Sequence, residues 1–223
     1  MTESCPSCGS AHITELSLLS RVNVPYGHCL HCDLIFIDPA FLLTSAEEKA
    51  RYENHENIEG DAGYEKFLSQ LWNPLQKHLG GLKSGIDFGS GPGPVLQKMI
   101  RRAGFHCEIY DPFYADDTSV LLGKYDFVVS TEVVEHFHFP KAAWMQLLSL
   151  VKPGGYLGVM TQLHPGGVEA ALFFENWWYA RDPAHVSFYS EKTLRWILTQ
   201  AGFEILEIQS PIVIARRDKT NMA

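Results

Sequence analysis

The feature that most constrains this chain is a glycine-rich turn after a short apolar run. Residues 85–88, Gly-Ile-Asp-Phe, lead into Gly89–Gly93, where three glycines alternate with other residues, and Pro94 follows. Glycine permits backbone angles closed to other residues, and proline suits the first position of a helix. The pattern therefore predicts a strand, a tight loop and a helix whose N-terminal amides face a bound anion. Asp87 is placed to hold a cationic or hydroxyl-bearing part of the same ligand.

Composition narrows the class of protein. The 223 residues, 46% of them hydrophobic, suffice for one large core and a small appendage. A formal net charge of −8 argues against general affinity for nucleic-acid backbones and favours a free small molecule as substrate. No apolar run approaches the roughly 20 residues of a membrane span, and the N-terminus lacks a basic-then-apolar leader. We expect a cytoplasmic protein without membrane association.

Four of the five cysteines form two closely spaced pairs, Cys5 with Cys8 and Cys29 with Cys32. Two such knuckles supply the four tetrahedral thiolates of a structural Zn²⁺ site. A pair of disulfides is the alternative, but nothing marks the chain as secreted. The fifth cysteine, Cys107, lies in an apolar run and is interpreted as a buried strand residue.

The cysteine pairs frame a small N-terminal unit. Residues 1–38 are predicted to be a zinc ribbon with strands at 13–19, 21–26 and 34–37. A unit of this size needs its metal to fold, and it is also a candidate surface for a protein partner.

Residues 39–80 are predicted to be a helical connector and cap. A helix at about 61–79 carries apolar residues at spacings of three and four, so one face docks on the core. Ahead of it, Tyr52, His55 and Asn57 form a polar cluster, interpreted either as a border of the active site or as a solvated linker.

Residues 81–223 alternate between strand and helix patterns. A helix ends at Gly104, and the strand at 105–110 ends at Asp111, which is placed to accept both ribose hydroxyls of a nucleoside. Further strands are predicted at 125–130 and 156–161, the second introduced by a turn at 152–155, with a helix at 140–151 between them and an antiparallel strand pair at 203–209 and 212–216. This order predicts a doubly wound α/β domain.

Three motifs resemble those of class I S-adenosylmethionine-dependent methyltransferases of small molecules. They are the acid-x-Gly-x-Gly-x-Gly turn, the segment Thr131–Phe137 and the His-x-x-Phe-x-Ser string at 185–190. The resemblance implies a Rossmann-like sheet and S-adenosylmethionine as cofactor. The cofactor-binding residues that it implies are Asp87, Gly89, Ser90, Gly91, Gly93, Asp111, Pro112, Thr131 and, from the preceding helix, Tyr64. Residues 112–124 are too short for the family's usual helix and third strand, so adenine-pocket residues are not transferred there.

Two other functions compete with methyl transfer. A nicotinamide-dependent oxidoreductase would use the same turn, but a dinucleotide site wants Gly-x-Gly-x-x-Gly, and here Pro94 occupies the place of the final glycine. A non-catalytic zinc-ribbon adaptor on a methyltransferase-like fold is the second alternative. The intact turn with Asp87 and Asp111 argues against it.

Candidate catalytic residues lie at 132–136 and at 185, which we expect to reach the rim of one cleft. His136, His185 and His164 are candidate bases, because histidine titrates near neutral pH. Glu132, Glu135, His136 and His185 also resemble the Mg²⁺-dependent pattern of certain O-methyltransferases, which makes Mg²⁺ a disfavoured alternative cofactor. The aromatic run at 173–179 is interpreted either as an acceptor pocket or as a helix packed on the core.

Overall fold

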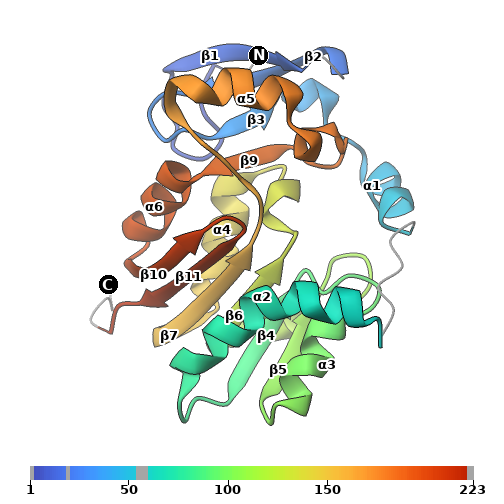
Figure 1. Cartoon of the computed structure of the whole chain (residues 1–223), viewed down its shortest axis with the longest axis vertical. Helices are drawn as coiled ribbons and strands as arrows, with labels where there is room; N and C mark the ends of the chain where they lie inside the picture. The colour runs from blue at the N-terminus through green and yellow to red at the C-terminus, as the bar shows by residue number, and fades with distance from the viewer. Residues whose placement is uncertain (1–2, 19–20, 54–59, 220–223) are drawn as a thin grey trace. The chain divides into compact units, whose positions relative to one another are not determined.

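The structure is a computed structural model that describes residues 3–18, 21–53 and 60–219. The chain forms two compact units (Figure 1). The first unit comprises residues 1–48, 134–144 and 162–197, and the second comprises residues 49–133, 145–161 and 198–223. The predicted domain boundaries, 1–38, 39–80 and 81–223, stay predictions, since these units follow other limits.

The second unit contains a six-stranded sheet in the order β10-β11-β7-β6-β4-β5. Its strands are β4 (Ser84–Phe88), β5 (His106–Tyr110), β6 (Tyr125–Thr131), β7 (Val151–Met160), β10 (Phe203–Gln209) and β11 (Ile212–Arg217). The first four are parallel, and β11 pairs antiparallel with both β7 and β10. The predicted α/β sheet with a closing antiparallel strand pair is therefore confirmed.

Helix α2 (Ala62–Leu79) supplies much of the core of this unit. The side chain of Asp61 caps it by accepting the N–H groups of Gly63 at 2.7 Å and Tyr64 at 3.2 Å. Its buried face carries Leu68, Leu71, Trp72, Leu75 and Leu79. The spacing of these residues matches one face of a 3.6-residue helix, as the sequence predicted. Burying this face fixes α2 against the sheet (Figure 1).

Three further helices of the chain are α3 (Val95–Arg102), α4 (Pro140–Ser149) and α6 (Glu191–Gln200). Helix α6 begins where Ser190 Oγ accepts the N–H of Thr193 at 3.2 Å, as a serine cap does. Residues 112–124 contain the 3₁₀ helix η2 (Thr118–Leu122) and add no strand to the sheet. Residues 152–155 belong to β7, where a register shift against β6 accommodates the predicted turn.

The first unit contains a five-stranded sheet in the order β1-β2-β3-β9-β8. Its strands are β1 (Ile13–Leu18), β2 (Arg21–Cys29), β3 (Ile35–Ile37), β8 (Leu163–His164) and β9 (Ser187–Ser190). Strand β3 pairs antiparallel with β9, Ile35 opposite Phe188 and Phe36 opposite Ser187. The three predicted ribbon strands are thus continued by strands from far along the chain.

Short helices complete the described structure: η1 (Pro39–Phe41), α1 (Ser45–Tyr52), η3 (Val134–His136), η4 (Gly167–Glu169), α5 (Ala170–Asn176) and η5 (Trp178–Arg181). Within the predicted helical connector, α1 ends at Tyr52, and His55 and Asn57 of the predicted polar cluster lie outside the described residues.

The aromatic run at 173–179 divides between core and surface. Phe174, Trp177 and Tyr179 are buried in the core of the first unit, with Phe174 packed edge-on against Tyr26 at a centroid distance of 5.0 Å. Phe173 and Trp178 are 40% and 64% exposed. Packing therefore accounts for three of the five aromatic side chains.

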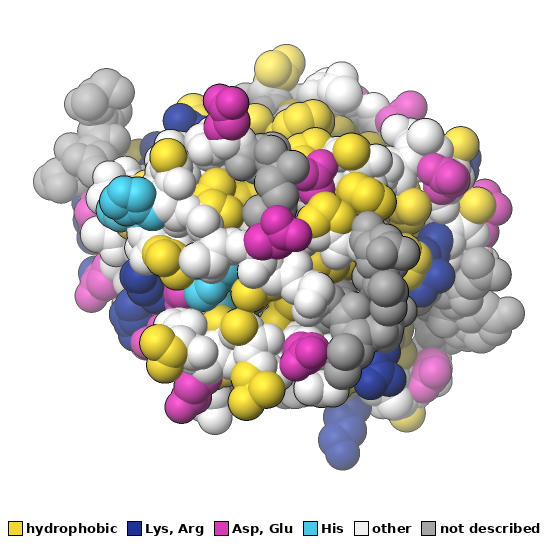
Figure 2. All heavy atoms as spheres, turned by 90° about the horizontal axis from the view of Figure 1, so that it is seen from above, with side chains coloured by type: hydrophobic (Ala, Val, Ile, Leu, Met, Phe, Trp, Pro, Cys, Tyr) yellow, Lys and Arg dark blue, Asp and Glu magenta, His cyan; other side chains and the backbone are white. Residues whose placement is uncertain are grey.

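Among the helices that the structure describes, none has the length and apolarity to cross a membrane. In the face drawn in Figure 2, lysine and arginine side chains lie toward the edges, and hydrophobic and acidic side chains are interspersed in its middle. Among the side chains coloured in that view, the basic ones do not form a continuous area in the middle of the face.

The amino-terminal ends of β4, β6 and β7 meet at Asp126. Its carboxylate accepts the N–H groups of Lys83 and Ser84 at 3.1 and 3.0 Å and pairs with the ammonium of Lys152 at 2.7 Å. Burial alone would raise the pKa of Asp126, but the Lys152 ammonium and the N–H donors lower it from 3.8 to about 2. The ionised group thus stabilises the fold above the unfolded pKa, and this contribution is lost as pH falls toward the folded pKa.

We expect Asp126→Asn to reduce the free energy of unfolding at pH 7 by about 1–2 kcal/mol, after allowance for the partial exposure of Lys152. The deficit should shrink as pH falls below about 4, because the wild-type carboxylate then loses its advantage. Urea denaturation at pH values from 7 to 3 measures the difference in unfolding free energy between variant and wild type. Asp116→Asn, at an exposed position, serves as control. A deficit that does not change with pH would contradict the prediction.

Candidate functional site

The predicted strand, turn and helix are present as β4, a loop and α3. Gly89 and Gly91 adopt φ of 82° and 65°, the left-handed region that favours glycine. A Cβ on Gly89 would also lie 2.3 Å from Val133 Cγ2, so no side chain fits there. Gly93 does not share the positive φ, so only the first two of the three glycines use backbone angles closed to other residues. The N–H of Gly89 donates to the carbonyl oxygen of Tyr110 at 2.7 Å, and this bond joins the loop to the end of β5.

Asp87 lies two residues before the first glycine of the turn and bonds to the helix that follows it. Its side chain is 1% exposed and accepts the N–H of Gln97 in the first turn of α3. Burial, with a smaller contribution from Asp111, raises its pKa to about 7, although the Gln97 N–H opposes the shift. The helix N-terminus therefore already faces a carboxyl group of the chain itself. Contact between Asp87 and a ligand stays a prediction.

Asp111 ties two loops together. Its Oδ2 accepts the N–H of Gly91 at 2.9 Å, and its Oδ1 accepts those of Phe113 and Tyr114 at 2.9 and 3.2 Å. Each carboxylate oxygen can accept two hydrogen bonds, so Oδ2 retains one position for a hydroxyl group in the described structure. Asp111 thus shapes the turn after β4 as well as being placed for the predicted ribose contact.

Two buried hydroxyls lie in the same loops. Within the described part of the chain, Ser90 Oγ and the Tyr114 hydroxyl have no hydrogen-bond partner. A buried hydroxyl without a partner costs free energy, and a polar ligand would restore the missing bond. The loops therefore fit a nucleoside-type cofactor with several hydroxyl and amino groups. Tyr114 was not among the predicted residues, because the segment after Asp111 departs from the resembled pattern.

Tyr64 of α2 lies close enough to two acids to sense their charge. Burial, then Asp87 and Glu132, raise the pKa of the Tyr64 hydroxyl to about 12. Glu132 has φ of 53°, a strained value for a residue with a side chain, and its N–H donates to Met160 at 2.8 Å. Strained residues often mark functional loops.

Two other residues of the predicted cofactor set differ in exposure. Thr131 precedes Glu132 and is half-buried, and Pro112 is exposed.

The first unit holds a cluster of Glu135, His136 and His185, in which one ligand-type atom of each residue lies within 4.8 Å of the others. Glu135 is fully buried, and the Tyr179 hydroxyl donates to its Oε1 at 2.5 Å. Nδ1 of His185 is 2.7 Å from the carbonyl oxygen of Tyr179, and Nδ1 of His136 is 2.9 Å from that of Ala184. Because a carbonyl oxygen only accepts, both Nδ1 atoms carry protons. In the neutral rings Nε2 is therefore the basic nitrogen.

The structure brings together only part of the predicted catalytic set. The rings of His136 and His185 lie 4.8 Å apart, while Glu132 is not in their cluster. His164 lies elsewhere in the first unit, 2% exposed, where burial lowers its pKa to about 4 and its Nδ1 accepts the N–H of Gly166 at 3.2 Å. Mg²⁺ prefers oxygen ligands, so a cluster with two imidazoles and one carboxylate fits it poorly.

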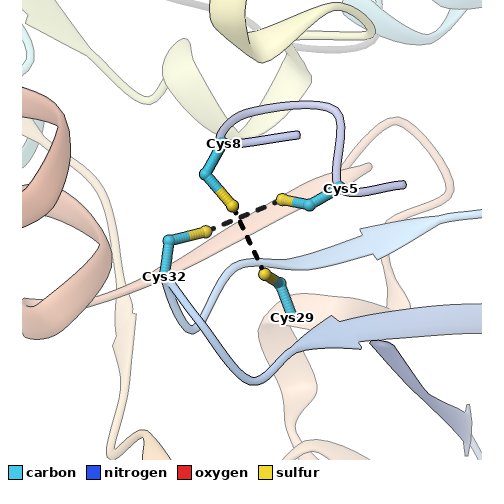
Figure 3. Close-up of side chains that lie close together, drawn as sticks. All are labelled: Cys5, Cys8, Cys29 and Cys32. Atoms are coloured by element: carbon cyan, nitrogen blue, oxygen red, sulfur yellow. Dashed lines mark hydrogen bonds between the residues drawn. The ribbon is translucent and has the colours of Figure 1, made fainter. Parts of the chain in front are cut away.

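The four paired cysteines converge on one point (Figure 3). Sγ of Cys5 is 3.6 Å from that of Cys32, and Sγ of Cys8 is 3.5 Å from that of Cys29. These distances are too long for disulfides and close to the roughly 3.8 Å between sulfurs that share a tetrahedral Zn²⁺ with bonds of about 2.3 Å.

Contact between the sulfurs shifts the thiol pKa values in opposite directions. The hydrogen bond from Cys32 lowers the pKa of Cys5 to about 5, while burial raises that of Cys8 to about 11. The hydrogen bond to Cys5, together with burial, raises that of Cys32 well above its ordinary value. The four cysteines, whose sulfurs all lie within 4.8 Å of one another, form a donor set that fits Zn²⁺.

Purified protein should contain one Zn²⁺ per chain, because this donor set suits zinc. Cys29→Ser should lower that content and increase amide exchange within residues 5–38, since the metal joins the two knuckles. Elemental analysis and hydrogen exchange measure the two effects, with Cys107→Ala as a matched cysteine control outside the cluster. Metal-free wild-type protein would rule out the zinc site.

The fold is similar to those of three solved methyltransferases. An O-methyltransferase family protein from Burkholderia thailandensis has 16% identity and a TM-score of 0.55, over 82% of this chain and 64% of that one. The 1,6-didemethyltoxoflavin-N1-methyltransferase of the same organism, solved with bound 1,6-didemethyltoxoflavin and S-adenosylhomocysteine, has 15% identity and a TM-score of 0.52, over 92% of this chain and 100% of that one. Magnesium protoporphyrin IX methyltransferase from Synechocystis PCC 6803, solved with S-adenosylmethionine, has 17% identity and a TM-score of 0.50, over 80% and 93%. At these identities the likeness shows the fold alone.

The family is established by sequence. No curated protein matches this chain. A family model described as a methyltransferase domain matches residues 55–208, which is more than half of the chain and includes the glycine turn, Asp111 and His185. The chain therefore belongs to the methyltransferase domain family.

Proposed function

We propose that this protein transfers a methyl group from S-adenosylmethionine to a small-molecule acceptor. The observation that carries the proposal is the pair of loops at Gly89–Gly93 and Asp111–Tyr114, joined by Asp111 and lined with two buried hydroxyls that lack partners in the described structure. The cofactor, when bound, supplies an electrophilic methyl group and leaves as a neutral thioether. The protein's own residues bind the cofactor and the acceptor, align them and accept a proton from the acceptor.

The cofactor is proposed to bind through the second unit. Asp111 accepts from the ribose, and the hydroxyls of Ser90 and Tyr114 bond to its polar groups. The full proposed set is Asp87, Gly89, Ser90, Gly91, Gly93, Asp111, Pro112, Thr131 and Tyr64, with Tyr114 added from the structure. Because Asp87 is buried with a pKa near neutrality, a nearby cationic amino group would favour its ionised form.

His185 is proposed as the base that takes the acceptor's proton. Its Nδ1–H is held by the Tyr179 carbonyl oxygen, so Nε2 carries the lone pair that accepts the proton. Tyr179 also donates to Glu135, and His136 lies against His185. The buried Glu135 carboxylate stabilises an imidazolium in this cluster as the proton arrives. Glu132 remains a candidate through its strained backbone and its proximity to Tyr64.

A small molecule is the favoured acceptor. The net charge of −8 opposes binding to nucleic-acid backbones, and two of the similar structures are named for small-molecule methyl acceptors. Those acceptors belong to those proteins. The nicotinamide and adaptor alternatives are weakened by the glycine spacing and by the intact Asp111 network.

Calorimetric titration should detect binding of S-adenosylhomocysteine and no binding of NAD. Asp111→Ala should weaken the binding of S-adenosylhomocysteine by roughly 10- to 150-fold. The substitution removes a charged hydrogen-bond acceptor worth about 1.5–3 kcal/mol and leaves the N–H of Gly91 without its bond to Asp111. Circular dichroism separates this effect from unfolding, and Asp117→Ala, an exposed helix cap in the same unit, serves as control. NAD binding with no S-adenosylhomocysteine binding would favour the oxidoreductase.

Once a metabolite screen has found an acceptor, His185→Ala should lower turnover by about 10²–10⁴, the contribution of general base catalysis, with unchanged S-adenosylhomocysteine affinity. The exposed His106→Ala is the histidine control. Added Mg²⁺ should leave the rate unchanged, since the cluster suits that ion poorly. An active His185→Ala enzyme would remove this base, and Mg²⁺ activation would restore the metal alternative.

A further inference from the structure

The proposed function leaves two features of the first unit unused: the cysteine cluster and a buried polar network beside it. The centre of the network is Asp33, which directly follows Cys32 and is 3% exposed. Its φ of 73° is strained for a residue with a side chain. Such a conformation persists only where the surrounding contacts hold it.

The Asp33 carboxylate joins three segments. It accepts from His28 Nε2 of β2 at 2.8 Å, from Ser190 Oγ at the end of β9 at 2.9 Å, and from the N–H of Gly167 at 3.1 Å. The approach to the 166–167 backbone is close, because a Cβ on Gly166 would lie 2.3 Å from Asp33 Oδ2. The residue after the second cysteine knuckle is therefore bonded to both ends of the segment that carries His185.

Backbone bonds continue the same connection. Beyond the β3–β9 pairing, the N–H of Ile37 donates to the carbonyl oxygen of Val186 at 3.0 Å. The N–H of Val186 donates to the carbonyl oxygen of Glu135 at 2.9 Å. Val186 is next to His185 in sequence, so the ribbon strand holds the backbone beside His185 on one side and Glu135 holds it on the other.

We propose that the cysteine knuckle and Asp33 position the segment 163–190, so that metal occupancy of the cysteine cluster controls the geometry of His185. Asp33 is a positioning residue, acting through Ser190 and Gly167. That His185 is a base rests on the proposed function, whereas the positioning itself does not.

The position of Asp33 between the cysteine knuckle and the network explains why a metal ion would matter here. Cys29 and Cys32 bracket the turn that presents Asp33, and the N–H of Asp33 donates to the Cys29 carbonyl oxygen at 2.7 Å. A metal ion bound by both sulfurs would fix the two ends of this turn, and with them the position of the Asp33 carboxylate. Loss of the ion would remove this restraint from the turn and from its bonds to Ser190 and Gly167.

The first test compares full-length zinc-loaded protein with protein stripped by a chelator, using hydrogen exchange. Amides of residues 163–190, with Val186 as the reporter, should exchange roughly tenfold faster or more without zinc, while those of β4 and β5 keep their rates. Exchange that increases only within residues 5–38 would overturn the proposal.

The second test keeps zinc bound and changes Asp33. In wild-type protein, ¹⁵N spectra of the His185 ring should show one tautomer, with the proton on Nδ1, because the Tyr179 carbonyl oxygen holds it. Asp33→Ala should produce a mixture of tautomers while S-adenosylhomocysteine affinity stays within about twofold. Asp33→Asn should restore the single tautomer in part, since its amide oxygen still accepts.

Asp117→Ala, a cap in the second unit, is the matched aspartate control and should leave the His185 spectrum unchanged. A single Nδ1–H tautomer in zinc-loaded Asp33→Ala would overturn the positioning role. Neither test requires methyl transfer, so a failed enzyme assay and a failed positioning test are distinguishable.

Discussion

One buried carboxylate organises the candidate cofactor site. The parallel pairing of β4 with β5, in register from Ser84 opposite His106 to Phe88 opposite Tyr110, brings both carboxyl ends to one edge of the sheet. Asp111 then bonds the N–H groups of the two loops that leave this edge. A carboxylate that accepts several N–H groups is held in one place. The loops are thus preorganised before any ligand binds, which reduces the cost of ordering them on binding.

The first unit solves a different problem, which is to hold polar groups in a defined position within a small core. The imidazoles of His136 and His185 each donate Nδ1–H to a backbone carbonyl oxygen, and Glu135 receives the Tyr179 hydroxyl. Backbone acceptors cannot change protonation state, so they select one tautomer over a wide range of pH. Tyr179 has two roles here, since its hydroxyl orients Glu135 and its carbonyl oxygen orients His185.

The N-terminal ribbon takes part in this arrangement through its sheet. Pairing of β3 with β9 and the Asp33 network connect the cysteine knuckles to the His185 segment by hydrogen bonds. In small β units a metal replaces part of the apolar core that the chain is too short to provide. A metal bound by the knuckles would also stabilise what the sheet continues into, which in this protein is β9, the strand that follows His185.

The sequence alone determined the local elements, because their signals are short-range. Alternating glycines after an apolar run predict a tight strand-to-helix turn, and cysteine pairs predict two knuckles. Residues 112–124 are too few for a further helix and strand, and the structure has only a 3₁₀ helix there. Tertiary structure decided which distant groups meet. Register across the chain decides the pairing of β3 with β9 and the hydrogen bonds of Asp111 to backbone N–H groups. Burial and register together decide that His164 lies apart from His185, and that Phe174 is buried while Trp178 is exposed. Local conformational preference encodes the former, whereas the latter follow only when buried polar groups find partners and apolar faces compete for one core.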